Sequence, residues 1–302
     1  MLPTTYTRPA WERCGTTTVP PRTHMRAIVA CVLVAVASAT ATSFCDHAEW
    51  HTVWSDEFDG VVLEDKNWNI PVHGPGGSDT RDASATLANV FVQNGTLVLR
   101  TDGHWNGSAW TNLTSGAVQS NGKAAFQAAG TPTRVCVMAK LPGGAGGGRG
   151  LWPAHWMMPD TKDCWPCAGE IDILEMINGD GFARGTYHWS RTNTSGDNQQ
   201  SFGEHPMPKG WADEWHEYSA EFDGRSLVHF AVDDVIYASV TPSTRSLPGL
   251  QRAAFFDVPY YIILNTAIGG GWPQPPDSST HLPAYHYVDY VRVARPNDGS
   301  VQ

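Results

Sequence analysis

The sequence lacks the features of a helical, membrane-spanning or nucleic-acid-binding protein. Segments with helical periodicity are nearly absent, which argues against a helical fold. Lysine and arginine together number 20, against 30 aspartate and glutamate residues. This acidic balance argues against nucleic acid and anionic lipid as partners, because both attract positive charge. One apolar run stands out, at residues 27–37, and it is shorter than the ~20 residues of a membrane span.

The first 41 residues are interpreted as an extension that ends in a secretory signal. Residues 1–24 are polar and without periodicity, and Met25 and Arg26 then precede the apolar run. Small residues between Ala37 and Ala41 fit a signal cleavage site. We therefore expect residues 1–41 to be removed, with Met25 as an alternative start. The competing interpretation is a retained membrane anchor, which the shortness of the run disfavours.

The remaining residues 42–302 are enough for one large all-β domain. The chain has 30 glycines, 21 prolines and 13 tryptophans, which favours a loop-rich β protein lined by aromatic rings. Short apolar runs separated by Gly, Pro, Asn and Asp predict the strands of an antiparallel β-sandwich. These runs lie at residues 90–92, 96–100, 134–140, 170–175, 217–222, 228–232, 260–267 and 287–293.

The stretch GEIDILE is the most distinctive part of the chain. Its three acids, Glu170, Asp172 and Glu175, alternate with aliphatic residues, a pattern typical of a strand with one buried face. Side chains two residues apart on a strand share a face, so Glu170 and Asp172 point the same way. Glu175 joins them only if a β-bulge near Ile173 or Leu174 adds one residue. We therefore predict such a bulge.

Three acids on one face indicate catalysis. Like charges placed together cost free energy, so a fold keeps them only for a reason. Two carboxylates at a sugar bond, one as nucleophile and one as proton donor, perform retaining glycoside hydrolysis. The alternative is a solvated acidic edge strand, which the interleaved apolar residues and flanking tryptophans disfavour.

The motif E-I-D-I-L-E, preceded by Trp165-Pro166 and Gly169, resembles the active-site signature of glycoside hydrolase family 16, especially its laminarinase-type endo-β-1,3-glucanases. The resemblance covers most of the chain after about residue 50. It implies a concanavalin-like jelly-roll sandwich with a substrate cleft across a concave sheet. It also implies that Glu170 is the nucleophile and Glu175 the general acid/base, with Asp172 positioning or tuning Glu170. Six further blocks occur in the family's order, at residues 54–58, 95–99, 151–156, 185–189, 264–270 and 288–293.

A polysaccharide needs flat apolar platforms for its sugar faces, and aromatic rings provide them. For each tryptophan the alternative is a place in the hydrophobic core. Trp272 resembles the family's tryptophan at the cleft rim, and His188 resembles a residue near the leaving group. Two departures from the family's pattern, Cys136 for a glutamate and Met138 for an arginine, leave the substrate subclass open. The substrate-binding candidates are Trp152, Trp156, Trp165, His188, Trp189 and Trp272.

Four cysteines remain after the signal, and in a secreted protein an even number predicts disulfides. Four cysteines allow three pairings. A redox or zinc C-x-x-C is disfavoured because no second C-x-x-C or histidine pair follows. We expect a small Cys164–Cys167 loop and a second bridge, Cys45–Cys136. If the source is a eukaryote, sequons predict N-glycosylation. They begin at Asn94, Asn106, Asn112 and Asn193.

Hydrolysis needs no cofactor, but the resemblance implies a structural calcium on the convex side. Glu57 and Asp289 match positions that supply oxygens there, with a carbonyl near Gly95. Carboxylates and carbonyls suit a hard cation. The alternative is that Asp289 only caps or pairs locally.

Together these features predict a secreted, monomeric, retaining endo-β-glucanase that cuts β-1,3 bonds. Its partner is a neutral β-glucan rather than nucleic acid or membrane. Two alternatives remain open on the same sandwich, a glucan-binding recognition protein and a cell-wall transglycosylase. Mixed-linkage glucan and sulfated algal galactan also remain open as substrates, although the acidic balance disfavours an anionic polymer.

Overall fold

The structure is a computed structural model that describes residues 43–71, 84–85, 87–128, 130–190, 192, 194–223, 227–241 and 258–297. The predicted signal at residues 1–41 and the sequon at Asn193 lie outside the described residues. Among the described residues, no helix is long and apolar enough to cross a membrane. Three short 3₁₀ turns occur there, η1 (Phe44–Asp46), η2 (Leu87–Asn89) and η3 (Trp211–Asp213).

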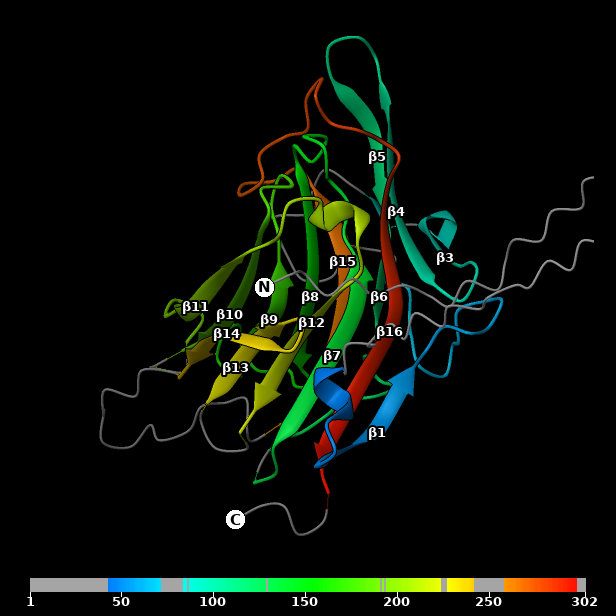
Figure 1. Cartoon of the computed structure of the whole chain (residues 1–302). Helices are drawn as coiled ribbons and strands as arrows, with labels where there is room; N and C mark the ends of the chain where they lie inside the picture. Colours follow the sequence, from blue (N-terminus) through cyan, green and yellow to red (C-terminus); the bar gives the residue numbers. More distant parts are fainter. Residues whose placement is uncertain are drawn as a thin grey trace, which may run out of the picture.

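Two largely antiparallel sheets lie face to face, and Figure 1 views the larger one from the front. The larger sheet runs in the order β14 (Val235–Val240), β13 (Val228–Val232), β12 (His216–Phe222), β7 (Thr133–Lys140), β16 (Ala284–Pro296), β4 (Leu97–Trp105), β5 (Trp110–Ser115) and β2 (Ser84–Ala85), with β1 (Trp50–Asp56) on β16 and β3 (Val90–Val92) on β4. The smaller sheet runs in the order β11 (Gln199–Pro206), β10 (Phe182–Trp189), β9 (Glu170–Glu175), β8 (Leu151–Pro159), β15 (Tyr260–Ile268) and β6 (Ala117–Gln119).

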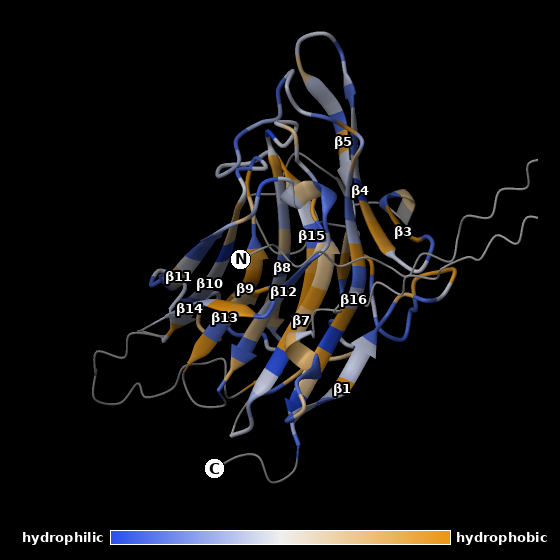
Figure 2. Cartoon of the chain, viewed as in Figure 1, coloured by the Kyte–Doolittle hydropathy of each residue, from blue (hydrophilic) through white to orange (hydrophobic). Residues whose placement is uncertain are grey.

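The hydrophobic core fills the space between the sheets. Val137 and Val291 of the larger sheet and Ile171 and Ile262 of the smaller one are fully buried in a single cluster. Figure 2 shows hydrophobic residues concentrated along the central strands. Each of the eight predicted runs falls on a strand of the structure. The predicted antiparallel β-sandwich is therefore confirmed.

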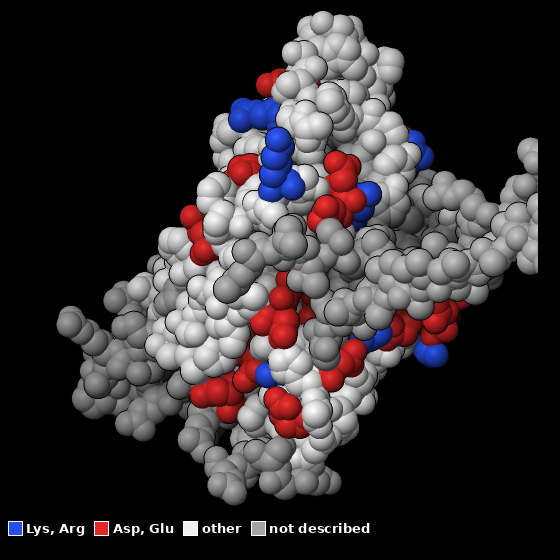
Figure 3. All heavy atoms as spheres, in the orientation of Figure 1, with Lys and Arg blue, Asp and Glu red and all other residues white. Residues whose placement is uncertain are grey.

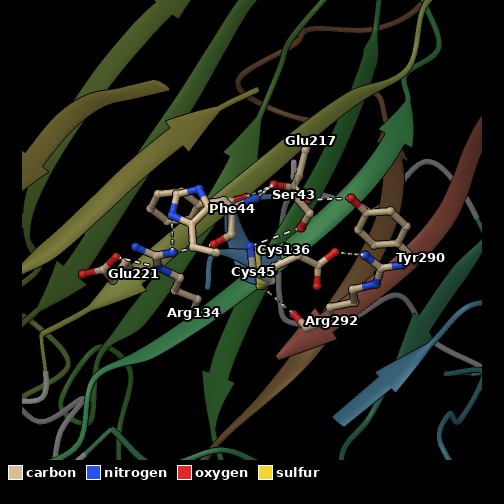
Figure 4. The surroundings of a disulfide bond; sticks show 12 residues. Ser43, Phe44, Cys45, Arg134, Cys136, Glu217, Glu221, Tyr290 and Arg292 are labelled. Carbon is tan, nitrogen blue, oxygen red and sulfur yellow. Dashed lines mark hydrogen bonds and ion pairs between the residues drawn. A yellow bond between two sulfur atoms is a disulfide. The ribbon is translucent and has the colours of Figure 1, made fainter. Parts of the chain in front are cut away.

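Both predicted disulfides are present, Cys45–Cys136 and Cys164–Cys167. The first ties η1 to β7 across the outer face of the larger sheet (Figure 4). Beside it, the Phe44 amide donates to Glu217 Oε1 at 2.7 Å. The Arg134 guanidinium lies 3.9 Å from the ring centroid of Phe44 and the same distance from that of Trp50. The departure at Cys136 therefore serves to anchor the start of the domain.

Two histidines are buried together in the sandwich. His155 Nε2 lies 3.0 Å from His286 Nε2, and His286 Nδ1 lies 3.2 Å from Thr266 Oγ1. Both rings are fully buried. Burial, which disfavours the charged imidazolium, lowers the pKa of His155 well below its usual value and the pKa of His286 to about 3. Both histidines are therefore neutral in the folded protein at neutral pH.

This pair should make the fold sensitive to acid. In the unfolded chain both histidines take up protons below pH ~6.5, whereas in the folded chain they do not. The contribution of His286 is thus complete above pH 6.5 and is lost as pH falls toward about 3, at about 1.4 kcal/mol per pH unit, and the contribution of His155 is lost in the same direction. We expect His286→Gln to flatten the decline in the free energy of unfolding between pH 6.5 and 5, measured by denaturant titration.

His104→Gln is the matched control, because His104 is exposed. It should leave the slope of the wild type unchanged. Comparing variants removes the contribution of the acidic residues, which titrate in the same range. An equal slope for His286→Gln and the wild type would show that the pair does not control acid stability.

Candidate active site

The three acids lie on β9, in the middle of the smaller sheet. On the neighbouring strand β8, Ala154 pairs with Glu175 and Trp156 with Asp172, and the register shifts between His155 and Trp156. The shift on the other side, in β10, falls between Arg184 and Thr186. Between Asp172 and Glu175, two residues of β9 therefore lie opposite a single residue of each neighbouring strand. The predicted bulge is confirmed.

The alternation of side chains places the acids on the outer face of the smaller sheet. Ile171 and Tyr187 point into the core between the sheets. Asp172 pairs with Thr186 across the strands, and both therefore point away from that core. The bulge restores Glu175 to the same side, where it contacts Thr186 and interacts with Glu170. All three acids thus form one site, as predicted.

Glu170 is the most open of the three acids and remains partly exposed. The Trp165 indole donates to Glu170 Oε2, and Trp165 itself is 43% exposed. Loss of surrounding water raises the pKa of Glu170, while His188, Trp165 and Asp172 oppose that rise. A partly exposed carboxylate held by donors suits attack on a substrate from this face.

Glu175 is buried and held at both oxygens. The Trp152 indole donates to Oε1 at 3.2 Å, and the Thr186 hydroxyl donates to Oε2 at 3.4 Å. Burial, together with the nearby charge of Glu170, raises the pKa of Glu175 to about 7. An acid that keeps its proton at near-neutral pH can donate it to a leaving group.

Asp172 lies between the other two acids and is almost completely buried. Burial and the charges of Glu175 and Glu170 raise the pKa of Asp172 well above its usual value. A protonated Asp172 hydrogen-bonded to Glu170 stabilises the anionic form of Glu170. The two carboxylates therefore share one proton, as in other close pairs of acids.

His188 borders the same site. Its Nε2 lies 3.4 Å from Asp172 Oδ2, and its Nδ1 lies 3.1 Å from Asn198 Oδ1. Ligand atoms of Glu170, Asp172 and His188 all lie within 4.8 Å of one another, a spacing that a cation could bridge. Glu170 and Asp172 are predicted catalytic residues and His188 is a predicted substrate-binding residue, so a cation bound here would occupy the active site.

The tryptophans predicted to bind substrate fall into two groups. Trp152 and Trp272 pack edge to face with ring centroids 5.0 Å apart beside Glu175, and Trp272 is 41% exposed. Trp156 points to the same face as Asp172 but is nearly buried, and its indole donates to Asn265 at 2.7 Å. The exposed rings of Trp272 and Trp165 are thus available to a ligand, whereas Trp156 is nearly buried beneath the site.

The prediction that Trp189 binds substrate is wrong. Trp189 is nearly buried in the main hydrophobic core, 5.6 Å from the ring of Tyr187. It follows His188 on β10, and successive side chains of a strand point to opposite faces. Because His188 borders the acids, Trp189 must point into the sandwich.

Sequence reasoning missed Arg184, Thr186 and Asn265. Arg184 pairs with Glu175 across the strands, and its charge opposes the rise in the pKa of Glu175. Arg184 is itself bound to Asp180 at 2.6 Å and to Glu204 at 2.8 Å. The signal for Thr186 was present, because it is two residues before His188 and therefore shares its face.

The structure does not fit Glu57 as a carboxylate ligand for the implied calcium. Arg292 binds both of its oxygens, at 2.9 and 2.8 Å. A guanidinium bound to both oxygens places a positive charge beside them and disfavours a second cation there. Asp289 is buried and engaged in interactions of its own. The proposal that Gly95 and Asp289 hold calcium stays a prediction.

Comparisons with known proteins agree with this geometry. A family model described as an XgeA-like catalytic GH16 domain matches residues 82–216. A β-glucanase of Rhodothermus marinus is 33% identical over 257 residues, which cover 82% of this chain and 85% of the relative. The laminarinase catalytic domain of Thermotoga maritima superposes with a TM-score of 0.69 at 30% identity, covering 83% of this chain and all of that domain.

Other relatives differ in their named substrates and roles. A keratan-sulfate endo-1,4-β-galactosidase of Sphingobacterium multivorum is 31% identical, covering 81% of this chain and 55% of that protein. A β-1,3-glucan-binding protein of Penaeus monodon is 32% identical, covering 45% of this chain and 42% of that protein. Similarity of this degree therefore leaves the glycan open.

Proposed function

Because the chain belongs to glycoside hydrolase family 16, we propose that it is a secreted, retaining endo-β-glucanase that hydrolyses internal β-1,3 bonds of laminarin-type or cell-wall glucans. The names of the β-glucanase and laminarinase relatives support the glucan. Two disulfides support secretion, because such bonds persist in oxidising compartments. The protein acts as a monomer and needs no cofactor for hydrolysis.

One observation carries the proposal, the contrast between Glu170 and Glu175. The two residues share a face of one strand, but Glu170 is partly exposed and Glu175 is buried with a pKa raised to about 7. Environments that separate two carboxyl groups in this way assign the roles of nucleophile and general acid. A protein that only binds glucan has no need of a buried acid near neutral pH.

In the first step, a carboxylate oxygen of Glu170 attacks the anomeric carbon and forms an ester with the sugar. The bond from that carbon to the leaving oxygen breaks, and Glu175 gives its proton to that oxygen. Asp172, which keeps its proton, donates a hydrogen bond to Glu170 before the attack. Open aromatic rings at Trp165 and Trp272 support the sugar faces.

In the second step, Glu175, now a carboxylate, takes a proton from water. The resulting hydroxide attacks the anomeric carbon, the ester bond breaks, and Glu170 leaves as a carboxylate. Each displacement inverts the carbon, so the net result is retention. Transfer to a second sugar in place of water would make the protein a transglycosylase through the same ester.

We expect the first-formed reducing ends from laminarin to be the β-anomer, observed by proton NMR before mutarotation. Parallel digests of laminarin, mixed-linkage glucan, agarose and carrageenan, with product sizing, test the substrate. Internal cleavage of laminarin supports the proposal. Initial α-anomer would contradict the role given to Glu170, and binding of laminarin without new reducing ends would instead indicate a glucan-binding protein.

A further inference from the structure

The hairpin formed by β4 and β5 projects beyond the ends of both sheets (Figure 1). Near its tip Trp105 and Trp110 face each other as a cross-strand pair, with ring centroids 5.6 Å apart and both rings partly exposed. The tip is closed by Asn106, whose Oδ1 accepts hydrogen bonds from the amides of Ser108 and Ala109. Two partly open tryptophans thus occupy an ordered position far from the core.

The outer part of this hairpin is uncharged in an otherwise acidic protein. Residues 103–115 contain no lysine, arginine, aspartate or glutamate, although the whole chain carries a formal net charge of −10. Figure 3 shows acidic groups spread over the visible body of the molecule, whereas the projecting tip carries none. In the sequence, asparagine, serine and threonine flank the tryptophans. Aromatic platforms with neutral hydrogen-bonding side chains suit a neutral sugar polymer rather than an anionic one.

Contacts link the hairpin to the active site. Trp272, which packs on Trp152 beside Glu175, lies in the connection between β15 and β16. Five residues further on, the carbonyl of Asp277 accepts a hydrogen bond of 2.7 Å from the Trp110 indole. At ~3.8 Å per residue these five residues span at most ~19 Å, the length of a few sugar units. The tryptophan pair therefore lies within reach of a chain that occupies the active site.

The connection between the two sites is fixed. His281 donates its amide to the Gly147 carbonyl at 3.0 Å, and the Thr280 hydroxyl donates to the Arg149 carbonyl at 2.8 Å. A side chain at Gly103 of the hairpin would meet Leu282, so the hairpin lies close against the connection. A fixed platform loses little entropy when it binds a ligand.

Resting on the proposed function, we infer that Trp105 and Trp110 form a distal binding site for the same neutral β-glucan chain that the active site cleaves. The site holds the polymer beyond the sugars that contact Glu170 and Glu175. Long chains reach it and short oligosaccharides do not. Its effect is therefore on the affinity for polymer, with little effect on the chemical step.

The experiment compares Trp105→Ala with the wild type, both produced without N-glycans, on laminarin and on a β-1,3-linked trisaccharide. We expect the loss of one aromatic platform to raise KM for laminarin about tenfold and to leave kcat unchanged. Trisaccharide kcat/KM should stay within about twofold, because chemistry at the acids is untouched. Trp105→Phe keeps a ring and should recover most of the affinity for laminarin.

His104→Ala is the matched control, since His104 is on the same strand and adjacent to Trp105 but points to the opposite face. It should leave both substrates unaffected. An unchanged KM for laminarin in Trp105→Ala would overturn the inference, as would an equal loss on both substrates. A change in oligomeric state on gel filtration would assign the pair to self-association instead.

Binding can be measured without turnover, which separates this inference from the proposed function. In a Glu170→Gln background, Trp105→Ala should reduce the amount of protein that pellets with insoluble β-1,3-glucan. If the wild type cleaves neither substrate, the proposed function fails while the pelleting assay still tests the hairpin. Equal pelleting with and without Trp105 overturns the distal site even if hydrolysis is confirmed.

Discussion

Glu170→Gln should reduce kcat on β-1,3-glucan by about 10⁴- to 10⁶-fold, because the amide cannot form the covalent ester through which both steps pass. Glucan binding should survive, since the open rings of Trp165 and Trp272 remain. Initial rates of reducing-end release measure the first quantity, and affinity electrophoresis in glucan-containing gels measures the second. Glu49→Gln, at an exposed acid remote from β9, is the control and should keep full activity.

Azide gives the role of Glu170 a sharper test. In Glu170→Ala the space left by the carboxyl group admits azide, which attacks the anomeric carbon of an activated β-glycoside once. One displacement inverts the carbon, so the product should be the α-glycosyl azide. A β-azide would mean that a different residue forms the ester. A loss of only a few-fold in the rate on glucan would lead to the same conclusion.

Glu175→Gln should reduce the rate on glucan by about 10²- to 10⁴-fold, because an unprotonated sugar alkoxide is a poor leaving group. Formation of the ester from an aryl glycoside with an acidic phenol should be much less affected, since that leaving group needs no proton. A burst of phenol followed by a slow steady state is the expected signature. Equal losses on both substrates would show that Glu175 is not the acid.

The pH dependence follows from the same pair. Glu175 must be protonated to act, so the rate should fall as pH rises through about 7. Glu170 must be ionised, so the rate should also fall as pH drops below its raised pKa. The resulting bell-shaped profile belongs to the coupled acids rather than to either alone. Glu175→Gln should abolish the alkaline decline, whereas Glu64→Gln, at an exposed acid paired with Lys66, should keep it.

The strands on either side of the catalytic strand were not predicted, for a definite reason. Strand β8 contains Pro153 and strand β10 contains Gly185, and both residue types usually interrupt a strand. In the structure a side chain at Gly185 would lie 2.3 Å from the ring of Phe230. The glycine is therefore required by the close approach of the opposite sheet, a contact between residues distant in sequence.

The sequence by itself determined the local features of this protein. The spacing of Glu170, Asp172 and Glu175 required a bulge if they were to share a face, because the side chains of a strand alternate with a period of two. The short apolar runs, separated by Gly, Pro, Asn and Asp, predicted the strands of the sandwich. The even set of cysteines in a secretory context led to both disulfides, though composition alone left three pairings open.

Only the tertiary structure decided which side chains meet at the site. Trp189 and Trp272 were both predicted to bind substrate, yet Trp189 is buried in the core and Trp272 is open beside Trp152. The unequal environments of Glu170 and Glu175 likewise depend on burial by Trp152 and Thr186 from neighbouring strands. Desolvation is a property of the packed fold, so the pKa values that separate nucleophile from acid arise only when strands β8, β9 and β10 have assembled.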